Sequence, residues 1–379
     1  MPLYAATIFA SAFLLFLVQP VIAKQILPWF GELAPSKPAP GYLTRFYLMI
    51  ALGGAAGSIL VGVVAPFVLP AYFEIEGALV IVALLFLWQV RRDHQGMRTL
   101  GVAMSIVVIG CASWSIRQFY AGTVVAMRNF YGVLRVREAG QGDLHIRTLI
   151  HGNVRHGTQY PSVPRYPTNY YVPTSGIGRL LSQRPNVPHR VGIIGLGVGT
   201  LAAYGVPGDI MRFYEIDPAV LQMAQRDFSY RRDSQAAIEY VLGDARLSLE
   251  REANQEFDVL VVDAFFGDAI PVHLLTNEAP GIYMRHLKPG GVTAIHVSNK
   301  FLDLIPVVGN LAEAHHLHAL HLRDGTAKEP AQPSDWVLLS GQRKSLDRPK
   351  LTEVAKPVLV RRDWRLWTDD FNNLVQVLR

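Results

Sequence analysis

The stretch that decides the fold is VGIIGLGVGT at residues 191–200, followed by FYEIDP at residues 213–218. An apolar run ends in a glycine-rich loop, a helix-like segment follows, and a second apolar run closes on Glu215. Glycines permit a sharp turn after a strand and let a ligand approach the backbone, while an acid at the end of the next strand can accept both hydroxyls of a ribose. This order predicts the start of a nucleotide-binding βαβ unit. A tight turn without a ligand is the simpler alternative.

The chain on either side of this stretch has two different compositions. Residues 1–117 are strongly apolar with few charges, whereas residues 174–379 have the mixed composition of a soluble domain. The formal net charge is +6, but no run of interleaved basic and aromatic residues accompanies it. We therefore expect no nucleic-acid partner and assign much of the basic excess to membrane topology. The single cysteine, Cys111, rules out an internal disulfide framework.

Residues 1–117 are predicted to form a transmembrane region of about four helices, with three as the alternative. The candidate spans are residues 4–23, 46–69, 77–90 and 100–116. The last two are marginal in length for a bilayer. Basic residues after the fourth span favour a cytoplasmic carboxyl end, whereas the basic loop at residues 91–98 opposes it. The expected binding of a cytosolic nucleotide favours a cytoplasmic location of the carboxyl-terminal domain. We expect a multi-pass protein of the cell (inner) membrane, with the lipid bilayer as a partner and the carboxyl-terminal domain facing the cytoplasm.

Residues 118–173 are predicted to form a linker, a small β-hairpin domain and an aromatic loop. Two strand-like runs, residues 129–138 and 143–151, flank a turn-rich connection. The loop that follows contains four tyrosines, including Tyr170 and Tyr171. These aromatic side chains either wall a ligand pocket or only pack the loop.

Residues 174–379 alternate between short β-branched strands and helices, which predicts a doubly wound α/β domain. In such a domain, helices cover both faces of a parallel sheet and ligands bind at the carboxyl ends of the strands. Asp244 can cap a helix and still contact a ligand. Asp263 ends the fourth strand in this series, and we expect it to be functional. The residues expected at the strand ends are Gly195, Gly197, Gly199, Glu215, Gly243, Asp244 and Asp263.

These motifs resemble the class I methyltransferase fold and, more narrowly, the polyamine aminopropyltransferases, or spermidine synthases. That resemblance rests on IIGLGVGT, FYEIDP, GDA at residues 243–245 and VVDAFFGDAIP at residues 261–271. The whole chain is still more similar to the membrane-fused spermidine synthase-like group. The segments that carry this similarity are LIHGNVRHGTQ (149–159), YYVPTSGIG (170–178), IPVHLLTNEA (270–279), HVSNKFLDL (296–304) and WTDDF (367–371).

The resemblance implies a role for each motif. Glu215 would hold the ribose, and Gly243 with Asp244 the adenine, of decarboxylated S-adenosylmethionine or of S-adenosylmethionine, while the glycine loop lines the nucleoside. Asp263 corresponds to the family's general base, which takes a proton from the attacking amine. The substrate side, for a small amine such as putrescine, is expected at Tyr170, Tyr171 and Asp268. The family also implies a possible homodimer, and no metal is expected.

Three positions depart from the family pattern. Tyr171 stands where the family has a histidine, Val198 replaces the aspartate of the glycine loop, and Asp268 lies five residues after Asp263 where three is usual. Three hypotheses therefore remain: a membrane-anchored aminopropyltransferase, a methyltransferase on the same fold, and a non-catalytic membrane protein that senses a nucleoside.

Two further groups of polar residues attract attention. The acidic pair Asp369 and Asp370 would either hold the far end of a diamine or form a solvated surface. The histidine-rich residues 315–321 are interpreted as histidines at a helix end and on the surface rather than as a metal site.

Overall fold

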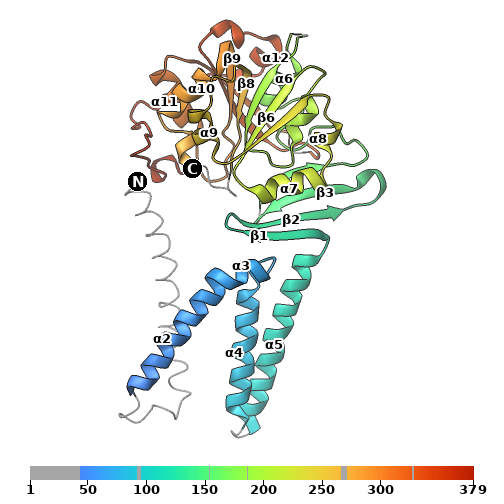
Figure 1. Ribbon diagram of the computed structural model, residues 1–379, viewed down its shortest axis with the longest axis vertical. Helices are drawn as coiled ribbons and strands as arrows, with labels where there is room; N and C mark the ends of the chain where they lie inside the picture. Colours follow the sequence, from blue (N-terminus) through green and yellow to red (C-terminus); the bar gives the residue numbers. More distant parts are fainter. Residues whose placement is uncertain (1–42, 92–94, 153, 186, 266–270, 327) are drawn as a thin grey trace. The chain divides into compact units, whose positions relative to one another are not determined.

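The structure is a computed structural model that describes residues 43–91, 95–152, 154–185, 187–265, 271–326 and 328–379 (Figure 1). The chain divides into two compact units, Met1–Ala65 and Pro66–Arg379. The first predicted span lies outside the described residues. The second corresponds to α2 (Leu43–Ile59), the π-helical turn η2 (Leu60–Val64) and α3 (Ala65–Val68).

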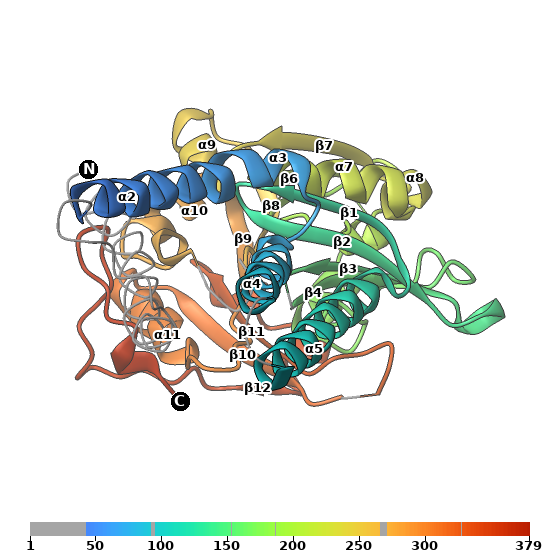
Figure 2. The ribbon, with the colours of Figure 1, turned by 90° about the horizontal axis from the view of Figure 1, so that it is seen from below.

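Two apolar helices, α4 (Glu74–Val90) and α5 (Gln95–Tyr120), pack side by side in the second unit (Figures 1 and 2). Ser105 Oγ donates to the carbonyl of Ala83 at 3.1 Å, and Ser115 Oγ donates to Glu76 at 2.8 Å. Among the described residues, α5 is the one helix long and apolar enough to cross a membrane. The expectation of about four spans stays a prediction.

A four-stranded antiparallel sheet follows these helices, in the order β1-β2-β3-β4. The predicted hairpin strands pair as β2 and β3, but residues 129–131 belong to β1 and its turn instead of to β2. The structure adds β4 in a segment expected to be a loop, because pairing with β3 overrides its glycine and polar composition. The bounds are β1 (Thr123–Asn129), β2 (Gly132–Ala139), β3 (Ile146–His151) and β4 (Val154–Gln159).

The carboxyl-terminal domain contains an eight-stranded sheet in the order β12-β10-β11-β9-β8-β5-β6-β7. Strand order reverses at β5, which lies between β6 and β8, and this arrangement with β11 inserted antiparallel defines a methyltransferase-like α/β domain. The parallel sheet expected from the sequence is present in β7-β6-β5-β8-β9. It does not extend to β11, which pairs antiparallel with both β9 and β10. The bounds are β5 (Arg190–Ile194), β6 (Ile210–Glu215), β7 (Ala237–Leu242), β8 (Phe257–Val262), β9 (Leu287–His296), β10 (His318–Asp324), β11 (Ser334–Ser340) and β12 (Ala355–Lys356).

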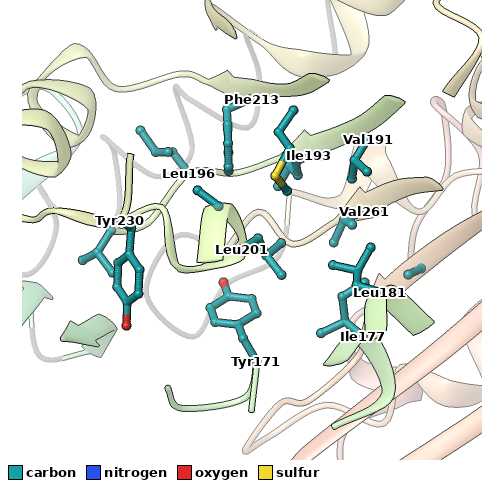
Figure 3. Close-up of a cluster of buried hydrophobic side chains, with 14 of the residues drawn as sticks. Tyr171, Ile177, Leu181, Val191, Ile193, Leu196, Leu201, Phe213, Tyr230 and Val261 are labelled. Atoms are coloured by element: carbon teal, nitrogen blue, oxygen red, sulfur yellow. The ribbon is translucent and has the colours of Figure 1, made fainter. Parts of the chain in front are cut away.

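Helices cover both faces of this sheet, as the alternation of the sequence predicted. One apolar cluster includes Ile177, Leu181 and Phe213 (Figure 3), and a second includes Leu249 and Tyr283. Helix α7 also lies along the small sheet (Figure 1), where Arg147 donates to the carbonyl of Asp227. The helices are α6 (Gly176–Ser182), α7 (Pro218–Asp227), α8 (Tyr230–Asp233), α9 (Ala245–Arg251), α10 (Ala279–Arg285), α11 (Ile305–Ala314) and α12 (Pro349–Thr352).

One helix expected from the sequence is much shorter in the structure. The segment after the glycine loop forms only a 3₁₀ turn, η4 (Thr200–Tyr204). Gly205 and Pro207 follow at once, and both residues disfavour a continuing helix. The chain therefore passes from the glycine loop to β6 by a short turn.

Candidate functional site

The glycine loop lies between the end of β8 and strand β4. Gly195, Gly197 and Gly199 have φ values of 97°, 53° and 81°, a backbone region that favours glycine. A β-carbon built on Gly195 would lie 2.2 Å from the carbonyl oxygen of Asp263, and one on Gly197 would lie 2.6 Å from that of His156. The loop thus needs glycine both for its backbone angles and for its close contacts.

Glu215, at the end of β6, closes onto this loop. Its side chain accepts the Leu196 N–H at 3.0 Å and the Asp217 N–H at 2.9 Å. Burial raises the pKa of Glu215, and these backbone hydrogen bonds counteract part of that rise. Each carboxylate oxygen keeps a further lone pair, which is the capacity that a pair of ribose hydroxyls requires.

Gly243 and Asp244 follow β7 and lie next in this series of strand ends. The Gly243 N–H donates to the carbonyl of Glu215 at 2.9 Å. Asp244 caps α9 by accepting the Leu247 N–H at 2.9 Å, and its other oxygen lies 2.9 Å from His273 Nε2. Burial alone would raise the pKa of Asp244, but these two partners lower it overall. The helix-cap interpretation is therefore correct for Asp244, and contact with a ligand stays a prediction.

The side chain of Asp263, just beyond β8, is only 4% exposed and has a partner on each carboxylate oxygen. Tyr171 donates its hydroxyl hydrogen to Oδ2. Nδ1 of His296 lies 2.7 Å from Oδ1. Burial and the nearby Asp263 raise the pKa of Tyr171 well above its ordinary value, so this hydroxyl is a neutral donor.

Aromatic rings surround the same carboxylate. The His296 ring stacks on Trp336 with centroids 4.6 Å apart and an interplanar angle of 17°. The centroid of the Tyr170 ring lies 4.7 Å from that of His296. Phe265 approaches His296 edge-on at 5.1 Å. The structure therefore brings Tyr170 and Tyr171 to Asp263, as a pocket wall would require, whereas Asp268 lies outside the described residues.

Sequence reasoning missed two histidines of this site. His296 ends β9, so its position at a fifth strand end was the signal that could have identified it. His156 lies on β4, a segment expected to be a loop; it belongs to the motif at residues 149–159 that carries the family resemblance, but that motif assigned it no role. Its Nε2 is buried without a hydrogen-bond partner among the described residues, and burial lowers the pKa of His156 to about 4.

The other polar candidates are engaged elsewhere. Asp369 forms a two-point ion pair with Arg246 at 2.6 Å instead of standing as a free anionic group. His315 bonds to the carbonyl of Asn277, and His321 pairs with Asp335, both at 2.7 Å. Within the described residues, no group of three or more His, Cys, Asp or Glu side chains is arranged to hold a metal ion.

The sequence is similar to curated proteins over parts of its length. It is 38% identical over 96 residues to the polyamine aminopropyltransferase of Vibrio vulnificus, covering 24% of this chain and 31% of that protein. It is 27% identical over 208 residues to a "probable polyamine aminopropyl transferase" of Bifidobacterium longum, covering 52% of this chain and 42% of that protein. An N-terminal histidine N-methyltransferase of Emericella nidulans is 36% identical over 112 residues, covering 27% of this chain and 19% of that protein. No family model matches the chain.

Two solved structures also align with this chain. A probable spermidine synthase from Corynebacterium glutamicum has a TM-score of 0.48 at 18% identity, covering 62% of this chain and 85% of its own. The spermidine synthase of Thermotoga maritima has a TM-score of 0.42 at 18% identity, covering 64% of this chain and 81% of its own.

Part of this chain is thus homologous to the polyamine aminopropyltransferases, and these homologues are transferases. The chain spans less than half the length of the curated relatives that it matches. The methyltransferase-like fold rests on the strand order described above.

Proposed function

We propose that the protein is an aminopropyltransferase. It would move an aminopropyl group from decarboxylated S-adenosylmethionine to a small amine such as putrescine, with Asp263 as the general base. The observation that carries this proposal is a buried carboxylate at the end of β8, beside a glycine loop that Glu215 also contacts, with each carboxylate oxygen held by a hydrogen-bond partner. Sequence similarity to polyamine aminopropyltransferases supports the same reaction.

The order of the strand ends supports a nucleoside site. The glycine loop would line the nucleoside, Glu215 has spare acceptor capacity for the ribose, and Gly243 with Asp244 would extend the site towards the adenine. Glu215 and Asp263 follow strands on opposite sides of β5, and the loop after β5 lies between them. A donor bound along these ends would therefore place its sulfonium side towards Asp263.

The chemistry follows from this placement. The amine nitrogen attacks the carbon next to the sulfonium, the new N–C bond forms, and the C–S bond breaks with its electron pair going to sulfur. The product nucleoside is methylthioadenosine, and the surplus proton of the amine passes to Asp263. Holding both reactants in line supplies much of the rate, and a general base adds about 10² to 10⁴-fold.

A methyltransferase that uses S-adenosylmethionine is the second candidate. It is supported by Val198, a buried apolar residue at the loop position where the family resemblance implies an aspartate for the aminopropyl amine. The partial match to an N-methyltransferase supports it as well. The third hypothesis is a non-catalytic nucleoside sensor, because the glycine loop and Glu215 could also serve nucleoside binding without any reaction.

The nucleoside product separates these candidates. Detergent-purified full-length protein is incubated with each cofactor and a panel of amines, and the product is identified by mass spectrometry. Methylthioadenosine supports aminopropyl transfer, whereas S-adenosylhomocysteine would assign methyl transfer. If the nucleoside binds but neither product forms, the hypothesis of a non-catalytic nucleoside sensor replaces both candidates.

We also propose that the protein is anchored in the cell (inner) membrane with its site facing the cytoplasm. Helix α5 has 26 residues and suitable hydropathy, and apolar side chains such as Leu85, Trp88 and Ile106 are exposed on α4 and α5. Resistance to alkaline extraction from membranes is the expected result, with the carboxyl-terminal domain digested by protease only from the cytoplasmic side. Release by alkali would refute the anchor. Light scattering in detergent tests the proposed homodimer.

A further inference from the structure

The His296 ring is held at both of its nitrogens and packed between aromatic neighbours. Nδ1 lies 2.7 Å from Asp263 Oδ1, and Nε2 lies 2.8 Å from Ser298 Oγ. Trp336 stacks on the ring at 4.6 Å, and the Tyr170 ring lies 4.7 Å away at a tilt of 31°. A buried ring held in this way has one orientation relative to Asp263.

The backbone supporting this ring is equally constrained. Strands β8 and β9 are adjacent and parallel, with Val262 opposite Ile295, so Asp263 and His296 follow at neighbouring strand ends. The Val297 N–H donates to the carbonyl of Asp335 at 2.9 Å. Both side chains are thus placed by paired strands rather than by a free loop.

The direction of the hydrogen bonds follows from the carboxylate at one end of this series. As the ionised carboxylate of the proposed general base, Asp263 can only accept, so the single hydrogen of a neutral His296 ring lies on Nδ1 and points at Asp263. Nε2 of the ring is then an acceptor, and the Ser298 hydroxyl donates to it. The Asp335 N–H donates in turn to Ser298 Oγ at 2.7 Å, which holds that hydroxyl in place.

We propose that His296 is a positioning residue for Asp263, and that the Ser298 hydroxyl stabilises the tautomer with its hydrogen on Nδ1. This inference rests on the proposed function and assigns a role that the family resemblance does not supply. With Tyr171 on Oδ2 and His296 on Oδ1, the plane of the carboxylate cannot rotate. The remaining lone pairs therefore keep one direction, towards the amine whose proton Asp263 takes. A general base works only within hydrogen-bond reach of that proton, so this alignment affects turnover rather than nucleoside binding.

Three variants test the role in the full-length protein. His296→Asn keeps a donor near the position of Nδ1, His296→Gln places its donor near Nε2 instead, and His296→Ala removes both. We expect kcat to fall about 10²-fold in the alanine and glutamine variants, because misplacing a reacting group by about 1 Å has that effect. The asparagine variant should recover at least tenfold of this loss. The affinity for methylthioadenosine, measured by calorimetry, should stay within threefold in all of them.

Several results would overturn the role. Equal kcat for the asparagine and glutamine variants would remove the requirement for a donor at Nδ1, and this comparison holds even where the alanine variant does not fold. A loss confined to nucleoside affinity would make His296 a binding or packing residue. Ser298→Ala should lower kcat only a few fold. Complete loss of turnover in this variant would instead make Ser298 a reacting group.

The tautomer is measured without any turnover, by ¹⁵N NMR of protein labelled on histidine. The proposal expects a neutral His296 ring protonated on Nδ1, and a shift of that signal in Ser298→Ala. A ring protonated on Nε2, or on both nitrogens, contradicts it. If no amine is converted by the wild type, the proposed function fails on its own, and the NMR result still decides the hydrogen-bond direction.

Discussion

The side chain of Val198 packs directly against the backbone of Gly157 on β4. A β-carbon built on Gly157 would lie only 2.4 Å from Val198 Cγ2, and Val198 itself is 2% exposed. The loop position where the family resemblance implies an aspartate is therefore part of the contact between the glycine loop and the small sheet. Strand β4 accommodates valine here, and a carboxylate at the same place would be buried.

Gly157→Ala tests this contact. Gly157 has a φ of 150°, and the added methyl group would overlap Val198, so we expect a loss of about 1–3 kcal/mol in the free energy of unfolding. Denaturant unfolding measures it. Val198→Ala in the same chain should restore part of the loss, and a purely additive double variant would show that the two side chains do not meet.

Tyr171→Phe isolates the hydroxyl that donates to Asp263. We expect kcat to fall about tenfold or more, because Oδ2 loses a buried donor while the ring still packs. Tyr204→Phe is the matched control, since its hydroxyl donates to the main-chain carbonyl of Tyr171 and not to Asp263. Steady-state kinetics with the preferred amine compare the two. Equal losses of kcat in both variants would assign the effect to packing of the loop.

The pH dependence of nucleoside binding tests Glu215. Burial raises its pKa above the ordinary 4.5, so the folded protein holds this proton more tightly than the unfolded chain does. As the pH falls from the raised pKa of the folded state towards the ordinary 4.5, protonation of Glu215 therefore stabilises the fold. It weakens nucleoside binding, because a protonated carboxyl accepts fewer hydrogen bonds from ribose. Calorimetry with methylthioadenosine should show affinity falling as the pH is lowered into the acidic range in which Glu215 takes up its proton. The Glu215→Gln variant should bind the nucleoside weakly, and its affinity should depend little on pH. If its affinity depends on pH as strongly as that of the wild type, Glu215 is not the group that titrates.

Asp369→Asn tests the ion pair that ties the carboxyl-terminal segment to α9. The pKa of Asp369 is lowered by the hydrogen bonds from Arg246, so the pair stabilises the fold above the ordinary aspartate range and is lost as pH falls below it. Because the side chain is 44% exposed, we expect about 1 kcal/mol at pH 7 from thermal unfolding. The difference in stability between the wild type and Asp369→Asn should vanish at acidic pH, where Asp369 is protonated. Asp370→Asn, at the neighbouring exposed acid, should have no such effect; equal effects would contradict the pairing.

The glycine loop and the strand-end acids could be predicted because local chemistry demands them. Gly195 needs both a positive φ and close contact with Asp263, and Glu215 ends a strand directly after that loop. Strand β4 could not be predicted because its glycine and polar composition is overridden by pairing with β3, and the antiparallel direction of β11 could not because it depends on pairing with β9, distant in sequence. The position of His296 at the end of a strand is apparent in the sequence, but its contact with Asp263 depends on β8 and β9 lying side by side.

The most direct test of the central proposal is turnover by Asp263→Asn beside its affinity for the nucleoside. We expect methylthioadenosine formation to fall by at least about 10²-fold, because asparagine cannot take the proton of the amine. The dissociation constant of the nucleoside should stay within a few fold, since Glu215 and the glycine loop are untouched. Retained turnover in this variant would contradict the assignment of Asp263 as the general base.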